Sequence, residues 1–153
     1  MPRGRRELPV ECARICSRAD LIIHAGDLME ASALESFEAL GPPLVAVHGN
    51  VDSAELREQL PARLSLDLGD VQLGVVHDAG PRRGRIERLR TLFPEHYAVV
   101  FGHSHLPLHE EQDGFQIFNP GSPTERRRSP FKSMGSATVG PDGIVFDLVY
   151  LGT

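Results

Sequence analysis

The first part of the chain alternates short apolar runs with segments whose apolar residues recur at helical spacing. Two runs, at residues 20–24 and 44–48, are too short for helices and stop at glycine-containing turns, so they predict buried strands. The segments around these runs predict helices, the last with Ser53 as its N-cap, over residues 8–19, 32–40 and 53–60. Strands that alternate with helices are typical of an α/β fold.

The pattern changes at residue 64, where apolar and polar residues alternate strictly over residues 64–68, and most of the elements that follow are predicted strands. The predicted strands span residues 64–68, 71–77, 98–101, 108–111, 115–118, 136–139 and 144–151. One more helix is expected over residues 85–93, where Pro94 ends it. The order of these elements predicts an αββα sandwich, in which two mixed sheets pack face to face with helices outside.

The length of 153 residues predicts one domain over residues 1–153, since domains usually run to about 100–200 residues. No apolar run approaches the ~18 residues that a membrane span needs, and no signal peptide opens the chain, so we expect a cytoplasmic protein. A net charge of −5 argues against extended nucleic acid as a partner. The two cysteines, Cys12 and Cys16, make neither a disulfide framework nor a four-ligand zinc site.

Polar clusters follow four of the apolar strands and carry the candidate chemistry. Asp27 and Asn50 follow the first two strands, His77 ends a later one, and a Gly-His-Ser-His segment with His103 and His105 follows residues 98–101. Ligands collect at the carboxyl ends of strands in α/β sheets, so we expect these side chains to lie together. This mixture of oxygen and imidazole donors suits Mn, Fe, Ni or Zn and is too rich in nitrogen for Mg or Ca.

Each cluster also has an ordinary structural explanation. A Gly-Asp or Gly-Asn pair after a strand is usually only a turn, and a lone histidine there is more often a satisfied surface residue than a ligand. The Gly-His-Ser-His segment is harder to explain by packing, because two imidazoles lie two residues apart. His24 and His48 are assigned structural or supporting roles, and His96 and His109 no role in the site.

In their order along the chain, the motifs resemble those of the calcineurin-like metallophosphoesterase superfamily: Gly-Asp, Gly-Asn-x-Asp, His, Gly-His-Ser-His and then Asn-Pro-Gly-Ser at residues 119–122. The resemblance covers nearly the whole chain, and it is strongest to the small single-domain phosphodiesterases of bacteria and archaea. It implies a hydrolase, a metal-dependent phosphodiesterase that cleaves a small phosphorylated substrate with a metal-activated hydroxide.

The resemblance also implies roles for individual residues. Asp27 would bridge two divalent metals, Mn first among them, with Ni, Zn or Fe as alternatives. Asn50, His77 and His103 would complete the shell of one metal, and His105 would bind the other. Catalysis would rest on Asp27, Asn50, His77 and His103, because the hydroxide forms on the metals that they hold.

Further residues are expected to support the metal ligands or to contact the substrate. Asp52 would fix a neighbouring histidine through a hydrogen bond. Val51 stands where relatives that cleave phosphomonoesters have a histidine, and valine cannot protonate a leaving group, which favours phosphodiesters. Arg126 and Arg127, in a basic run that continues to Arg128, could grip a substrate phosphate. A solvated basic loop is an equally good explanation of that run.

One departure from the family pattern weakens the expected site. The family begins with a strand that ends in Asp-x-His, and this sequence has none. A start assigned at an internal methionine, a truncated sequence or a true loss would each explain this, and we favour the first. We therefore expect one bound metal or none, with weak or absent hydrolysis, and exposed strand edges that a homodimer could cover.

A second function comes from a different class of protein. The retromer subunit with this fold has an imperfect metal site and serves protein binding, so the alternative is a non-catalytic scaffold. An upstream Asp-x-His strand in the gene would favour the enzyme, whereas upstream stop codons would favour the scaffold.

Overall fold

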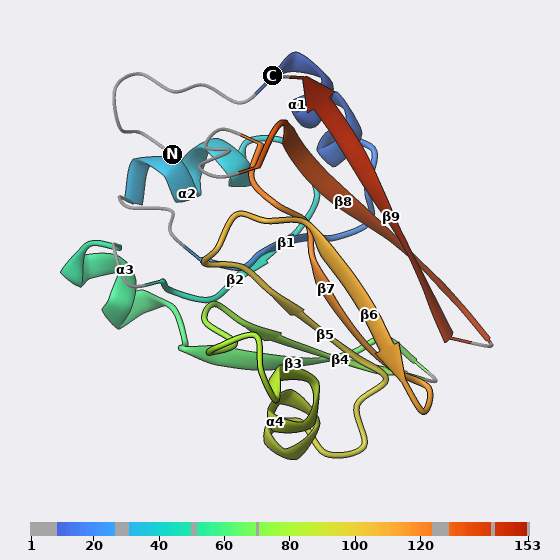
Figure 1. Cartoon of the computed structure of the whole chain (residues 1–153). Coiled ribbons are helices and arrows are strands. Elements are labelled where there is room, and N and C mark those ends of the chain that lie inside the picture. The colour runs from blue at the N-terminus through green and yellow to red at the C-terminus, as the bar shows by residue number, and fades with distance from the viewer. Residues whose placement is uncertain are drawn as a thin grey trace.

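The computed structural model describes residues 9–26, 31–49, 52–69, 71–123, 129–141 and 143–152, without the side chains of residues 31–34. Helices and strands alternate first and strands dominate later, as the sequence predicts (Figure 1). In chain order the elements are α1 (Val10–Ser17), β1 (Ile22–His24), α2 (Ala31–Glu38), β2 (Leu44–Ala46), α3 (Ala54–Gln59), β3 (Arg63–Asp67), β4 (Gln72–Val76), α4 (Arg85–Leu92), β5 (Ala98–Phe101), β6 (Leu108–Gln112), β7 (Phe115–Asn119), β8 (Lys132–Gly140) and β9 (Gly143–Gly152).

A five-stranded mixed sheet forms the largest layer, with the strand order β3-β4-β5-β7-β6. The three central strands run parallel, and the two outer strands run antiparallel to their neighbours. All residues of β5 and β7 are buried, as expected for central strands covered on both faces. β3 alternates between exposed and half-buried positions, which agrees with the alternation in its sequence.

Two small sheets make up the second layer, the parallel pair β1-β2 and the antiparallel hairpin β8-β9. Neighbouring residues of β1 point to opposite faces, because Ile22 packs in one apolar cluster and Ile23 borders another. β9 spans the same two clusters, with Phe146 in one and Val149 against the other. The two pairs therefore share one layer of the expected sandwich. Among the described residues, this second layer consists of two separate two-stranded sheets, whereas the sequence predicts one continuous sheet in each layer.

Helices cover the outer faces of both layers, which completes the αββα order. Leu89 and Phe93, at the end of α4, pack with Val99 and Ile117 of the five-stranded sheet. On the opposite side, Cys12 of α1 packs in the cluster that includes β1 and β8. Figure 1 shows α4 below the five-stranded sheet and α1 beside the β8-β9 hairpin. Among the described helices, none is both long and apolar enough to cross a lipid bilayer.

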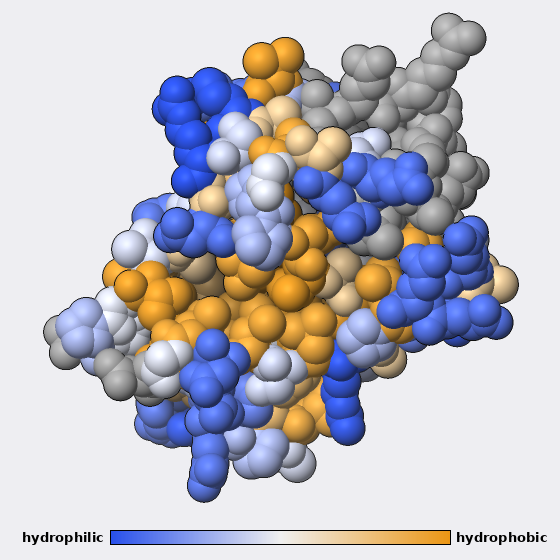
Figure 2. Space-filling model, turned by 180° about the vertical axis from the view of Figure 1, so that it is seen from behind, coloured by the Kyte–Doolittle hydropathy of each residue, from blue (hydrophilic) through white to orange (hydrophobic). Residues whose placement is uncertain are grey.

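Part of the core between the layers reaches the surface. Ile23 of β1, Ala25 just after that strand and Leu148 of β9 border the inter-sheet cluster, yet they are only partly buried. Figure 2 shows a broad apolar area at the centre of one face, with polar residues around it. Among the described residues, β1 pairs only with β2 and the hairpin strands pair only with each other. Each of these strands therefore has one edge that no other described strand pairs.

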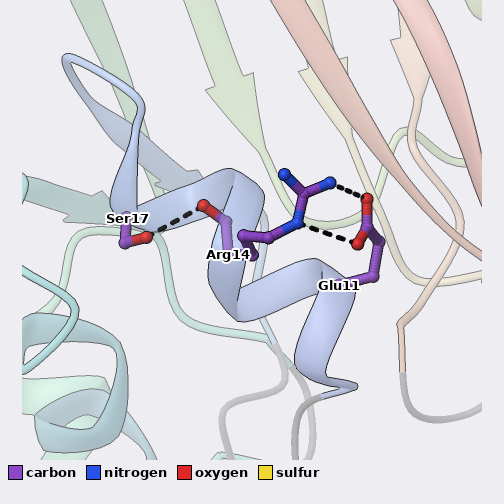
Figure 3. Close-up of polar contacts among 3 residues, drawn as sticks. All are labelled: Glu11, Arg14 and Ser17. Carbon is purple, nitrogen blue, oxygen red and sulfur yellow. Dashed lines mark hydrogen bonds and ion pairs between the residues drawn. The ribbon is translucent and has the colours of Figure 1, made fainter.

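Local signals in the sequence explain where several elements begin and end. Ser53 caps α3, as predicted, by accepting a hydrogen bond from the Leu56 amide at 3.3 Å. On α1, the Arg14 guanidinium donates to the Glu11 carboxylate, and this pairing lowers the pKa of Glu11 (Figure 3). The Ser17 hydroxyl donates to the Arg14 carbonyl at 2.8 Å in the last turn. Both hairpin strands, β8 and β9, extend beyond their predicted bounds.

Candidate metal centre

Two predicted site residues lie side by side at the ends of β4 and β5. These strands are parallel neighbours, and their last residues, Val76 and Phe101, stand opposite each other in the register. The pairing continues one step further, because the Gly102 amide donates to the His77 carbonyl at 2.9 Å. His77 and His103 therefore leave the sheet at the same edge, as the rule for strand ends predicts.

The two imidazole rings face each other across a short distance. His77 Nε2 and His103 Nδ1 are 3.3 Å apart, and the rings meet edge to face with centroids 5.2 Å apart. His77 is only 4% exposed, and its Nδ1 lies 2.7 Å from the carbonyl oxygen of Ala25. A carbonyl can only accept, so Nδ1 carries the proton and the Nε2 lone pair is directed toward His103.

This arrangement fits part of a transition-metal site. Metal-bound histidines usually donate their other ring N–H to a carbonyl or carboxylate, as His77 does to Ala25. Two nitrogens that each lie about 2.0–2.1 Å from one ion are separated by about 2.9–3.4 Å at ordinary bond angles. The observed 3.3 Å falls in that range. A hydrogen bond between the rings has a similar length, so the distance fits either arrangement.

The turn after β1 brings a third loop to this edge. Gly26 has a φ of +107°, and a Cβ there would lie 2.5 Å from His77 Nδ1. Only glycine therefore allows the backbone to approach the ring this closely. The Gly26 amide donates to His24 Nδ1 at 3.1 Å, which gives His24 the structural role that the sequence suggests. The described chain therefore passes beside His77 at Gly26, the residue that precedes Asp27 in the sequence.

The Gly-His-Ser-His segment forms a strained turn after β5. His103 and His105 adopt φ values of +73° and +60°, each of which costs a residue other than glycine about 1–2 kcal/mol. The side chain of Asn119, at the end of β7, is fully buried against this turn. Its Nδ2 donates to the Gly102 carbonyl and to Ser104 Oγ, both at 3.2 Å, and its Oδ1 accepts from the Gly121 amide at 2.9 Å.

The turn after β2 also holds a buried carboxylate. Asp52 is 7% exposed, and its Oδ2 accepts from the Gly49 amide at 2.6 Å. This bond joins the described residues Gly49 and Asp52. The predicted bond from Asp52 to a histidine stays a prediction. His48 has a buried Nδ1 with no partner among the described residues.

Several predicted site residues are not part of the described contact between His77 and His103. Four lie outside the described residues: Asp27, Asn50, Arg126 and Arg127. His105 is buried, at 9% exposure, but the described part of the chain brings no three His, Cys, Asp or Glu side chains into a group that could hold a metal. A cavity of about 260 Å³ beside α4 contains none of the predicted site residues, and it is lined by Ile86, Glu87, Arg90, Thr91 and Gln112.

The contacts of Asn119 were not predicted from the sequence. In the sequence, Asn-Pro-Gly-Ser marks the family resemblance and assigns no contact to Asn119. The sequence does contain one indication of these contacts, a polar residue directly after the predicted strand Phe115–Phe118. A buried polar side chain at that position must find hydrogen-bond partners.

An αββα sandwich with histidines converging at neighbouring strand ends is the architecture of a metallophosphoesterase. The chain belongs to the calcineurin-like phosphoesterase superfamily, a hydrolytic and metal-dependent family whose domain model matches residues 4–140. A probable metallophosphoesterase of Methanocaldococcus jannaschii is 36% identical over 136 residues, which cover 87% of this chain and 68% of that protein. A phosphodiesterase of the same organism is 26% identical over 113 residues, covering 67% of this chain and 66% of that protein.

Solved structures confirm the fold. The structure of vacuolar protein sorting 29 from Cryptosporidium parvum covers all of this chain and 93% of its own, with a TM-score of 0.77 and 16% identity. The zinc complex of the Entamoeba histolytica protein of that name covers 99% of this chain and 94% of its own, with a TM-score of 0.73 and 18% identity. At these identities the likeness shows the fold alone.

Proposed function

We propose that this chain is a metal-dependent phosphodiesterase that acts on a small phosphorylated substrate where the turns after β1, β4 and β5 meet. The observation that carries this proposal is the contact between His77 Nε2 and His103 Nδ1, with the other nitrogen of His77 fixed on Ala25. The phosphodiesterase relative named above supports the substrate class. We propose Mn as the metal, with Ni, Zn or Fe as alternatives, and one equivalent of it in this chain.

Each residue has a defined task in this proposal. His77 presents its Nε2 as a ligand because the Ala25 carbonyl holds the proton on Nδ1. His103 supplies the second nitrogen, while Asp27, Asn50 and His105 are proposed to add the remaining donors. Divalent metals at such a site supply a hydroxide near neutral pH and neutralise charge on phosphoryl oxygens.

The substrate preference is proposed to rest on Val51, Arg126 and Arg127, with Asp52 in a supporting role. Val51 offers no proton to a leaving group, so esters with good leaving groups are favoured. Arg126 and Arg127 are proposed to hold a phosphate oxygen, and Asp52 to support a ligand histidine. Cys12 and Cys16 are free thiols, which agrees with the reducing cytoplasm that we propose as the compartment.

Hydrolysis of bis-p-nitrophenyl phosphate tests the proposal, with p-nitrophenyl phosphate as the monoester comparison. We expect weak metal-dependent cleavage of the diester that exceeds cleavage of the monoester, strongest with Mn among Mn, Ni, Zn and Mg. His103→Ala and Asp27→Ala should each reduce the rate by at least about 100-fold. The matched control is His96→Ala, because His96 bonds Ser65 Oγ and the Pro94 carbonyl, away from the site.

The outcomes separate the two functions considered for this fold. Wild-type rates in Asp27→Ala would contradict the metal-binding role of that carboxylate. A folded chain that cleaves neither ester with any of the four metals would contradict the enzyme and leave the scaffold function.

A further inference from the structure

The strained turn after β5 needs a group that holds it in place. Glu95, His103, His105 and Asp113 are the described residues other than glycine with positive φ. Asp113 precedes Gly114 in a tight hairpin turn, where this conformation is common. His103 and His105 have no such setting, because they alternate with Gly102 and Ser104 in a turn between β5 and β6. An unsupported turn of this kind would sample other conformations.

The side chain of Asn119 contacts this turn at two points. Its amide nitrogen donates to the Gly102 carbonyl just before His103 and to Ser104 Oγ just after it. Ser104 Oγ in turn accepts from the Leu106 amide at 3.2 Å, which extends the network past His105. The backbone of both histidines is thus enclosed between groups that connect to Asn119.

Asn119 itself is held rigidly. It ends β7, whose residues are all buried and which pairs with β5 in the parallel sheet. Its amide oxygen accepts from Gly121, so the carboxamide cannot flip without losing bonds at both ends. The side chain is 0% exposed, and water cannot replace these bonds.

We propose that Asn119 is a positioning residue that fixes the Gly102–His105 turn and thereby aims His103 at His77. This role deepens the proposed function and rests on it. Asn119 touches neither imidazole in this role. It acts through the backbone of the turn, as outer-shell partners of metal ligands do.

A purely structural role is the competing explanation, and the chain offers a matched control. Gln116 lies on the same strand, is also buried at 4% exposure, and its amide also bonds two groups. Its Nε2 donates to the Ile144 carbonyl at 3.1 Å and its Oε1 pairs with His109 at 2.6 Å, both away from the turn. Gln116→Ala therefore removes a similar buried amide without changing the support of His103.

The first measurement needs no metal. Amide hydrogen exchange of Gly102, Ser104 and Leu106 is followed by NMR in Asn119→Ala, relative to amides of β5. We expect exchange in the turn to rise by about tenfold, the effect of losing one to two hydrogen bonds, and to stay within about twofold of wild type in Gln116→Ala. Ser104→Ala removes one arm of the network and should give a smaller rise, which keeps the test open if Asn119→Ala does not fold.

The second measurement is Co²⁺ affinity, read from the visible absorption of the bound ion. Asn119→Ala should weaken binding by about 10–100-fold and Gln116→Ala by less than about twofold. Equal losses in both variants, or unchanged exchange in the turn, would overturn the positioning role. If wild type shows no saturable Co²⁺ binding, the proposed function fails, while the exchange data still decide whether Asn119 fixes the turn.

Discussion

Replacing Gly26 with alanine tests how closely the turn after β1 packs on His77. The new Cβ would lie 2.5 Å from His77 Nδ1, about 1 Å inside ordinary contact, so the ring must turn away from the Ala25 carbonyl. Two costs add in Gly26→Ala. A positive φ costs alanine about 1–2 kcal/mol, and the lost buried hydrogen bond costs about 1–3 kcal/mol. We expect the free energy of unfolding to fall by about 2–5 kcal/mol.

Gly41→Ala is the matched control for backbone strain alone. Gly41 has a similar φ, +113° against +107°, but no atom lies within 4 Å of its added Cβ. Urea unfolding followed by circular dichroism should show a loss of about 1–2 kcal/mol for this variant. Mn²⁺ affinity should fall by about tenfold or more in Gly26→Ala only. Equal destabilisation of the two variants, with equal affinity for Mn²⁺, would refute the packing of His77 on this turn.

Three further predictions concern the helices. Ser53→Ala removes the N-cap of α3 and should lower the free energy of unfolding by about 1 kcal/mol in urea, whereas an unchanged midpoint would argue against the cap. Arg14→Gln should raise the pKa of Glu11 toward its ordinary value in a carbon NMR titration, and an unchanged pKa would contradict the ion pair. Because the pairing lowers this pKa in the folded chain, its contribution to stability is present above the ordinary carboxyl pKa and is lost as the pH falls through the lowered pKa. The hydrogen bond with Cys16 and burial raise the pKa of the Cys12 thiol. Cys12 should therefore react with a disulfide reagent at pH 8 only as the chain unfolds. Rapid reaction in the native protein would contradict the burial of this thiol.

Local patterns predicted most of the secondary structure. The cap at Ser53 and the alternation through residues 64–68 correspond directly to the observed α3 and β3. The contact of His77 with His103 was also predictable, because both follow apolar strands and parallel strands share one edge for their carboxyl ends. These features depend on short-range periodicity and on a general rule of topology.

Features set by long-range pairing were not predictable in the same way. β1 and β2 have three residues each, and the sequence of such short strands does not specify their neighbours. The split of the second layer therefore appears only in the structure. The contacts of Asn119 depend on β7 lying next to β5, although β6 separates them along the chain. Asp27, Asn50, Arg126 and Arg127 stay predictions, since they lie outside the described residues.

Isothermal titration of the chain with Mn²⁺ tests the central claim most directly, namely that His77 and His103 belong to one metal centre. We predict one equivalent bound by wild type and by His96→Ala, and no saturable binding by His103→Ala. Two equivalents in wild type would contradict the single site expected for this sequence. Binding by His103→Ala that equals wild type would contradict the centre itself.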